Sequence, residues 1–487
     1  MSLKQAIGRG EPGPLQIIVL LIVLQLLLTL FTDGFALSFD EAMWHYIGRN
    51  WFREGLIPYT GGVDNKSPLI FAIFGLSDKF FGVNYWFPRL LGTVCQSVGI
   101  YYVYKIGKCA AGENAGILAI SFYGLSLLWH ATGGKYVSYT ETYEVMLMIL
   151  SVYWFISAQN KKGLFISGFL AGIAVGFRFT AFFAIAALFI TSLNKGRFAV
   201  VVFCIGVLSG ILFLILIGFV AGIDLRSLFT YTLADNFGGG SATDHDFSWR
   251  LHNLSAKFLY SGMTLFYPLV VGYLIIKRKV DLFVLWFIFA FLAINVVGIY
   301  DNVHLKEVLP ALSLMSAFAV AHGVRLHKFY FKPLLLVILL LFLPRLSEPF
   351  RNLKKLLRHE ADQPVKYCQT PFIKPDEGDR KKLGCWLKAN TKEQEKVYVA
   401  GFGAQVQAYS ERISPTIYFN VTQTRIAKER FFRDMQKEKP AMILVPLFRE
   451  YTQFVGQDLR LFVDQIIRKD YYLEGCRYNY EVYRLKR

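Results

Sequence analysis

Two neighbouring carboxylates, Asp40 and Glu41, follow the first apolar run of the chain. A carboxylate at the edge of an apolar segment can take the proton of a reacting hydroxyl, which is general base chemistry. A structural role is also open, because Ser38 and Glu41 have the spacing of a helix capping box and Asp40 would lie in the first turn, where the helix dipole favours it. From spacing alone, both roles stay open for Asp40, and capping is favoured for Glu41.

Two basic residues have the setting of an anion-binding site. Lys66 comes just before Pro68, which begins a short apolar segment. The N–H groups at a helix start and such a lysine can converge on one phosphate. Arg178 lies between two apolar runs, where an arginine is expected to pair with an anion such as a phosphate. For Lys66 the alternative is a side chain that reaches to the lipid headgroups.

Three further polar residues lie at the ends of apolar runs. Glu141 and Glu144 are three residues apart, so on a helix they share one face and could bind a metal or orient a hydroxyl. Compensation of a helix dipole is the alternative, and we prefer it for Glu144. His304 opens a late apolar run, where a hydrogen-bonded interfacial histidine is the alternative to a ligand-binding one. No nucleotide-binding loop or zinc spacing accompanies these residues.

The elements that must position these residues are long apolar segments. The chain is 54% hydrophobic and only 18% charged, whereas soluble proteins carry about 25% charged residues. Several runs approach or exceed the ~20 residues that cross a bilayer as a helix. We therefore predict an all-α polytopic membrane protein with eleven transmembrane helices, at residues 15–32, 86–107, 112–132, 141–159, 163–177, 179–193, 198–221, 257–276, 280–299, 305–325 and 330–346.

The basic residues predict how these helices are oriented. The chain has a net charge of +18, half of which lies in the C-terminal domain, and the other basic residues cluster at every second junction, as at Lys161 and Lys162. By the positive-inside rule those junctions are cytoplasmic, so no nucleic-acid partner is needed to explain the charge. The N-terminus is then cytoplasmic, and an odd number of crossings places the C-terminal residues outside. We expect a multi-pass membrane protein whose candidate site faces the extracytoplasmic side.

The chain is expected to have two domains. Residues 1–346 form the transmembrane catalytic domain, whose outer loop 33–85 carries interfacial helices at 40–54 and 68–81. Residues 347–487 form a small extracytoplasmic α/β domain. In it we expect strands at 396–402, 416–420 and 441–447, helices at 423–437 and 451–469, and a hairpin at 471–485. A Cys368–Cys385 disulfide is expected, although Cys476 allows other pairings.

The chain resembles the GT-C superfamily of polytopic glycosyltransferases. Its motifs look most like the bacterial branch of dolichyl-phosphate-mannose-protein mannosyltransferase-like proteins, which includes the aminoarabinose transferases. The resemblance covers roughly residues 15–325 and is carried, in chain order, by Asp40-Glu41, Lys66-Ser-Pro-Leu, Phe87-Pro-Arg-Leu-Leu, Thr140-Glu-Thr, Gly176-Phe-Arg-Phe-Thr and His304-Leu-Lys-Glu-Val-Leu-Pro.

The resemblance implies a hexosyl or pentosyl transfer from a polyprenyl-phosphate donor to a lipid, glycan or protein acceptor at the outer face. Asp40 matches the family's general base, and Lys66 and Arg178 match cations that hold the lipid phosphate. His304 is placed with these cations. Glu141 matches a second acidic position that is often Asp in relatives, and Ser67 replaces a usual proline. A single displacement at the anomeric carbon would invert the configuration at that carbon.

Other features of the reaction and other functions stay open at this stage. Glu41 and Glu144 are candidates for contact with the acceptor or a metal, so a divalent cation is compatible with the chain, although its motifs require no cofactor. A secondary transporter would also have about a dozen spans and buried charges. Transporters usually show two related halves, however, and no such internal repeat is evident in this sequence. A receptor or adhesin anchor is a third interpretation, in which the outer tail is the functional part.

Overall fold

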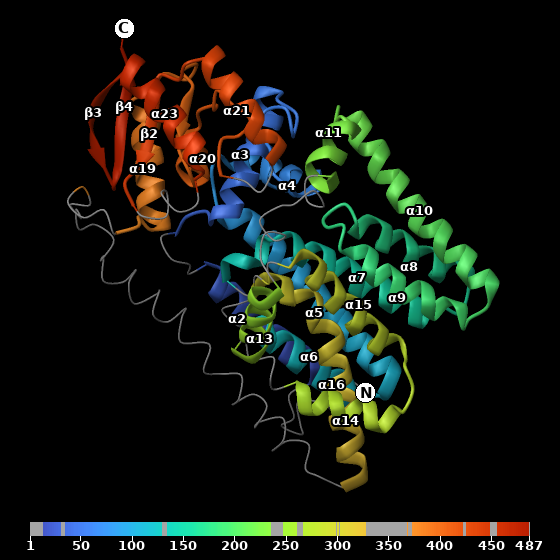
Figure 1. The fold of residues 1–487 in the computed structure, drawn as a ribbon. Coiled ribbons are helices and arrows are strands. Elements are labelled where there is room, and N and C mark those ends of the chain that lie inside the picture. The colour runs from blue at the N-terminus through green and yellow to red at the C-terminus, as the bar shows by residue number, and fades with distance from the viewer. Residues whose placement is uncertain are drawn as a thin grey trace. The chain divides into compact units, whose positions relative to one another are not determined.

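The computed structural model describes residues 13–30, 35–128, 134–234, 247–260, 266–298, 300, 302–327, 368, 373–421, 425–448 and 455–486 (Figure 1). The chain divides into two compact units. One, the helical unit, comprises residues 1–31, 89–217 and 245–351. The other, the mixed unit, comprises residues 32–88, 218–244 and 352–487, so the segment after the first helix shares a unit with the C-terminal residues.

The helical unit is built from apolar helices joined by short turns. Polar caps start several of them: the Asn160 side chain accepts the Gly163 N–H at 3.1 Å before α8, and Asp281 accepts two N–H groups before α15. Its helices are α2 (Pro14–Leu30), α5 (Trp86–Ala111), α6 (Glu113–Ser126), η2 (Gly134–Ser138), α7 (Thr140–Ser157), α8 (Lys161–Ala174), α9 (Ala181–Leu193), α10 (Arg197–Val220), α13 (Phe247–Tyr260), α14 (Tyr267–Lys277), α15 (Leu282–Val297), η5 (Asn302–Glu307) and α16 (Leu309–His327).

Most of the predicted apolar runs coincide with helices. Within the described ranges, α10 alone has both the length and the apolar composition to cross a bilayer, and five shorter helices are apolar. Exposed leucines at positions 208, 212 and 216 lie along α10, as lipid-facing side chains would. The run at 257–276 is divided between α13 and α14, and the run at 330–346 lies outside the described residues. The number of spans therefore stays a prediction.

The backbones of α8 and α10 approach each other closely. A Cβ atom added to Gly168 would lie 2.2 Å from the Phe203 carbonyl oxygen, and one added to Gly210 would lie 2.4 Å from that of Phe169. Glycines on both helices allow this approach, since any side chain would separate the backbones. The glycines of α8 therefore serve its crossing with α10.

The mixed unit combines two early helices with a small sheet. The sheet has the order β1-β2-β4-β3, in which β1 and β2 are parallel and the other pairs antiparallel. Buried side chains of β1, β2 and β4 pack with α19 into its core. The elements are α3 (Phe39–Glu54), α4 (Pro68–Phe81), α11 (Leu225–Phe229), η3 (Thr230–Ala234), α19 (Glu377–Ala389), β1 (Val397–Val399), α20 (Ala404–Ser410), α21 (Arg425–Lys437), β2 (Met442–Pro446), α23 (Gln457–Asp470), β3 (Tyr471–Arg477) and β4 (Tyr480–Leu485).

The predicted strand at 416–420 is wrong. Residues 416–420 are buried but irregular, because their backbone donors bond locally rather than to a neighbouring strand. The Thr416 N–H donates to the Ser414 hydroxyl at 3.3 Å, and the Tyr418 N–H donates to the Thr416 hydroxyl at 3.2 Å. Such side-chain bonds compete with sheet formation. The helices α19 and α20, which the pattern did not predict, occupy the space beside β1.

The disulfide joins Cys368 to Cys476, so the expected Cys368–Cys385 pairing is wrong. The two Cα atoms are 6.0 Å apart, which is within the usual range for a disulfide. Cys385 is a free, exposed residue of α19. Three cysteines allow three pairings, and only the fold decides which two approach each other.

The free cysteines offer a test of sidedness without any substitution. Cys385 and Cys109 are both exposed, and the charge pattern places them on opposite sides of the membrane. We expect a membrane-impermeant maleimide to label Cys385 in intact cells and Cys109 only after permeabilisation, as read by peptide mass spectrometry. Cys368 and Cys476 should react only after reduction. Labelling of Cys109 together with Cys385 in intact cells would contradict the predicted orientation.

Candidate functional site

The first candidate group lies on α3 in the mixed unit. The Ser38 N–H donates to the Glu41 carboxylate at 2.7 Å, and Glu41 is fully buried, so its predicted capping role is confirmed. Asp40 lies in the same first turn and is partly exposed. The cap therefore holds Glu41 inside the unit, and Asp40 is the acid of this turn that is accessible to a substrate.

A close crossing of α3 and α4 determines where Lys66 lies. A Cβ atom added to Gly48 would lie 2.3 Å from the Phe71 carbonyl oxygen, and one added to Gly75 would lie 2.6 Å from that of Gly48. Any larger residue would push the two helices apart. Because α4 begins at Pro68, this crossing also sets the position of the preceding Lys66 relative to α3.

The loop before α4 is attached to the face of α3 that carries Asp40. The Trp44 indole N–H donates to the Asp64 carboxylate at 2.9 Å in a buried hydrogen bond. Trp44 and Asp40 are four residues apart and so lie on one face of the helix. Tyr59 donates its hydroxyl proton to the Lys66 carbonyl oxygen at 2.7 Å. These bonds bring the candidate base and the candidate phosphate-binding lysine to one side of α3.

The Lys66 ammonium has no acidic partner among the described residues. Its hydrogen bond goes to the neutral Asn65 side chain, at 2.9 Å from Nζ to Oδ1. Lys66 is therefore a partly exposed positive charge that remains available to an anion.

The second candidate group is a buried ionic cluster in the helical unit. Arg178, in the turn between α8 and α9, contacts the Glu141 carboxylate through Nη1 and lies 3.0 Å from Glu307 Oε1 through Nε. Its Nε is 3.8 Å from Glu144 Oε2. All four side chains are buried. One guanidinium thus faces three carboxylates that come from α7 and η5.

His304 and Lys306 complete this cluster from η5. His304 Nδ1 lies 2.7 Å from Glu141 Oε1 and 3.3 Å from Arg178 Nη2. The shorter contact indicates that Nδ1 carries the proton and donates to Glu141, because one nitrogen cannot also accept from Arg178. The Lys306 ammonium donates to the Tyr136 carbonyl oxygen at 2.6 Å and to the Thr142 hydroxyl at 2.9 Å. Lys306 therefore holds η2 against the start of α7.

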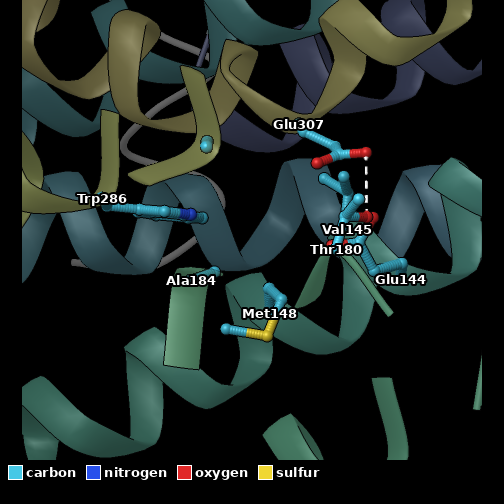
Figure 2. Close-up of a pocket in the computed structure, with 8 residues that line it drawn as sticks. Glu144, Val145, Met148, Thr180, Ala184, Trp286 and Glu307 are labelled. Carbon is cyan, nitrogen blue, oxygen red and sulfur yellow. Dashed lines mark hydrogen bonds between the residues drawn. The ribbon is translucent and has the colours of Figure 1, made fainter. Parts of the chain in front are cut away.

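A small cavity lies beside the cluster (Figure 2). Its volume is about 10 Å³, which is room for about one water molecule. On its wall the Thr180 hydroxyl donates to Glu307 Oε1 at 3.3 Å. Glu144 is only 3% exposed, yet its Oε2 accepts no hydrogen bond from any residue that the structure describes. The lining comprises Glu144, Val145, Met148, Thr180, Ala184, Trp286, Ala290 and Glu307.

The structure gathers the predicted residues into these two groups. Glu141, Arg178 and His304 contact one another, as the common sidedness of their runs suggested, and Glu144 faces Arg178 rather than solvent. Asp40, Glu41 and Lys66 form the other group. The described part of the chain contains no set of three or more acidic, histidine or cysteine side chains arranged to hold a metal ion.

Several residues of these groups were missed by sequence reasoning. The sequence pattern places Lys306 and Glu307 in the segment that begins at His304 but predicts no role for either residue. A signal was available, because three of the four residues at 304–307 are polar although they open an apolar run. Trp44 gave no such signal, because a tryptophan at the membrane boundary is ordinary.

Comparisons with known proteins agree with the resemblance. The family model for dolichyl-phosphate-mannose-protein mannosyltransferase matches residues 65–221. The structure of ArnT from Cupriavidus metallidurans bound to undecaprenyl phosphate is similar, with a TM-score of 0.62 and 14% identity over 96% of this chain and 97% of that one.

A second solved structure has the same kind of fold. The archaeal oligosaccharyltransferase AglB from Archaeoglobus fulgidus, in complex with an inhibitory peptide and a dolichol-phosphate, matches with a TM-score of 0.55 and 11% identity over 97% of this chain and 74% of that one. No curated protein sequence is significantly similar to the chain. The resemblance to GT-C glycosyltransferases is therefore confirmed, through the family match and the shared fold.

The buried cluster predicts a strong effect of removing its guanidinium. Arg178→Gln leaves three buried carboxylates without that partner, and breaking a buried ion pair costs about 3–5 kcal/mol of unfolding free energy. We expect a large drop in the thermal unfolding midpoint of the detergent-solubilised protein. Replacement of the exposed Arg226, Arg226→Gln, is the control and should change the stability by less than about 0.5 kcal/mol. Equal stability of the two variants would show that Arg178 is not held by carboxylates.

Proposed function

We propose that the protein is a GT-C glycosyltransferase that moves a sugar from a polyprenyl-phosphate donor to an acceptor hydroxyl at the extracytoplasmic face of the membrane, with inversion at the sugar. The observation that carries the proposal is the buried hydrogen bond between Trp44, one turn after Asp40 on α3, and Asp64, two residues before Lys66. The fold shared with the undecaprenyl-phosphate complex of ArnT supports a donor of this class.

The reaction needs a base at the acceptor oxygen, where a bond forms, and a cation at the phosphate, where a bond breaks. The acceptor oxygen forms a bond to the anomeric carbon while its proton passes to the Asp40 carboxylate. The bond between the anomeric carbon and the phosphate oxygen breaks, and the polyprenyl phosphate leaves with the electron pair. The ammonium of Lys66 stabilises the negative charge that the phosphate gains. No oxidant, reductant or nucleotide is required.

The buried cluster has a supporting role in this scheme. Arg178 and His304, which the resemblance assigns to the donor phosphate, are already paired with Glu141. A phosphate could reach Arg178 only if a carboxylate gave way, so we assign the contact with the phosphate to Lys66. Glu141 then orients Arg178 and His304, and Glu144 is the member of the cluster with an oxygen left to accept a bond from a substrate hydroxyl.

The identities of sugar and acceptor are the open part of the proposal. The relatives of known structure were solved with undecaprenyl phosphate in one case and with a peptide and dolichol-phosphate in the other. A lipid, a glycan or a protein hydroxyl is therefore the acceptor class to examine, with the enzyme in the bacterial inner membrane. A divalent cation is compatible with the carboxylates, so each assay should be repeated with EDTA.

In the decisive assay, the purified protein in bacterial membrane vesicles receives one radiolabelled donor at a time. Each donor is undecaprenyl phosphate linked to labelled mannose, glucose, N-acetylglucosamine or aminoarabinose. The proposed function predicts that label moves to a lipid, glycan or protein fraction with one of these donors. A secondary transporter would instead carry the intact donor across the vesicle membrane. An anchor for a receptor or adhesin would do neither.

Asp40 is the residue on which turnover should depend most. Asp40→Asn keeps the size and the first-turn position of the side chain but cannot take a proton. We expect turnover to fall by about 10²- to 10⁴-fold, the usual yield of general base catalysis, at nearly unchanged donor affinity. Glu41→Gln is the matched control at the neighbouring position and should cost much less. Near-normal turnover of Asp40→Asn would remove the base assignment and direct the search to Glu141.

Lys66 should affect the use of the donor rather than the proton transfer. A charge-assisted contact contributes roughly 1.5–3 kcal/mol, so Lys66→Ala should raise the donor KM or Kd by about 10- to 150-fold. Lys79→Ala removes an exposed charge from the last turn of α4 in the same unit and should leave donor affinity unchanged. If both variants bind the donor alike, Lys66 is a headgroup-facing lysine and not a phosphate ligand.

A further inference from the structure

The C-terminal part of the mixed unit is bonded directly to the residue that precedes α3. The Leu37 N–H donates to the Tyr409 hydroxyl oxygen at 2.8 Å, and the Leu37 carbonyl oxygen accepts from Gln405 Nε2 at 2.8 Å. Both hydrogen bonds are buried. The two polar groups of one peptide residue are thus taken by two side chains from α20, which lies more than 360 residues later in the chain.

The geometry of α20 makes these two contacts a matched pair. Gln405 and Tyr409 are four residues apart, so they project from one face of the helix, one turn apart. Leu37 sits immediately before the N-cap Ser38, and Asp40 follows in the first turn. Leu37 lies outside the helix, so its buried N–H and C=O groups have no intrahelical partner and are satisfied by the α20 side chains. The α20 side chains therefore determine how the chain enters α3.

The pair is itself held in place by α19. Arg380 Nη1 donates to Gln405 Oε1 at 2.7 Å, which orients the amide so that its nitrogen points to Leu37. A Cβ atom added to Gly384, one turn further along α19, would lie 2.6 Å from the Cβ of Tyr409. This close approach leaves little room for the Tyr409 side chain to move. Side chains that are locked by such outer contacts give a site its precision.

A second anchor lies two turns along α3. The Ser414 N–H donates to the Tyr46 hydroxyl oxygen at 2.8 Å, and the rings of Tyr46 and Phe419 have centroids 4.1 Å apart. Burial raises the pKa of Tyr46 to about 12, so its phenol stays neutral. The interior of α3 is thus attached to the C-terminal residues independently of Leu37, and loss of the Leu37 contacts should loosen the first turn without releasing the helix.

We infer that Gln405 and Tyr409 are positioning residues for the proposed base, and that they hold Leu37 so that the Asp40 carboxylate points to the acceptor hydroxyl. This inference rests on the proposed function. It gives the C-terminal α/β segment a role in the reaction, because a base misplaced by about 1 Å can lose up to about 10²-fold in rate.

The test removes one hydroxyl at a time. Tyr409→Phe deletes the acceptor for the Leu37 N–H and keeps the ring. Its control is Tyr471→Phe, because the Tyr471 hydroxyl makes an equally buried hydrogen bond, to the Pro440 carbonyl oxygen at 2.6 Å, within the same unit. With the labelled undecaprenyl-phosphate sugar that supports transfer, Tyr409→Phe should lower kcat by about 5- to 50-fold at an unchanged donor KM. Tyr471→Phe should stay within about two-fold of the unsubstituted protein.

Two measurements separate positioning from a loss of stability. In the Asp40→Asn background, Tyr409→Phe should have less than about a two-fold further effect, since coupled residues are not additive. Hydrogen exchange of the peptide that covers residues 36–43 should accelerate in Tyr409→Phe and not in Tyr471→Phe. Gln405→Glu provides a second variant, because a carboxylate still accepts from Arg380 but cannot donate to Leu37, and it should behave like Tyr409→Phe.

The outcomes distinguish this inference from the proposed function. If Asp40→Asn loses turnover while Tyr409→Phe and Gln405→Glu match Tyr471→Phe, the positioning role is overturned and the base assignment stands. If Tyr409→Phe costs the same factor with and without Asp40, its role is structural and the inference is also overturned. If Asp40→Asn turns over normally, the base assignment fails, and the positioning role fails with it.

Discussion

An ionised side chain can be buried among apolar helices only if an opposite charge or several hydrogen bonds replace the water that it loses. Arg178 shows how this constraint organises the helical unit. Its guanidinium lies in a turn, yet Glu141 from α7 and Glu307 from η5 converge on it. Three separate segments are therefore held at one point by charge. The same constraint explains why Lys306 and Thr180 direct their polar atoms to neighbours rather than to the apolar surroundings.

The constraint also limits what this cluster can do. A guanidinium that is shared among carboxylates is not a free cation, whereas the ammonium of Lys66 has, among the residues described, only a neutral amide as its partner. Lys66 and Arg178 look alike in the sequence, because each is a basic residue beside an apolar run. In the fold they have different chemistry. Within the described part of the chain, the excess of acid around Arg178 leaves one oxygen of Glu144 without a donor, next to a cavity the size of a water molecule.

In the mixed unit α3 is the common support. Its first turn carries Asp40, Trp44 connects it to the loop that ends at Lys66, and Gly48 lets α4 approach closely. Leu37 and Tyr46 join the same helix to residues near the C-terminus. One helix therefore links the candidate base to the loop that carries Lys66 and to the segment around α20, and it does so through buried hydrogen bonds.

Local patterns were sufficient to predict the elements whose ends carry a proline, a glycine or a capping side chain. The segment 68–81 was predicted with the bounds that α4 has, since Pro68 starts it and Gly82 follows it. The capping role of Glu41 was likewise readable from its spacing to Ser38. Buried residues without such marks were misjudged. Residues 416–420 have the composition of a strand, but their donors bond to nearby hydroxyls, and that choice depends on what surrounds them.

The sequence by itself determined the apolar helices, the resemblance to GT-C glycosyltransferases and the residue types that could act as base and cation. These follow from composition and short-range spacing, which are properties of the chain alone. Only the tertiary structure decided which charges meet. Arg178 pairs with Glu141, 37 residues away in the chain, and Leu37 bonds to Tyr409, 372 residues away. Contacts at such separations depend on how helices cross, and a hydrophobic pattern specifies which face of a helix is buried but not which partner covers it.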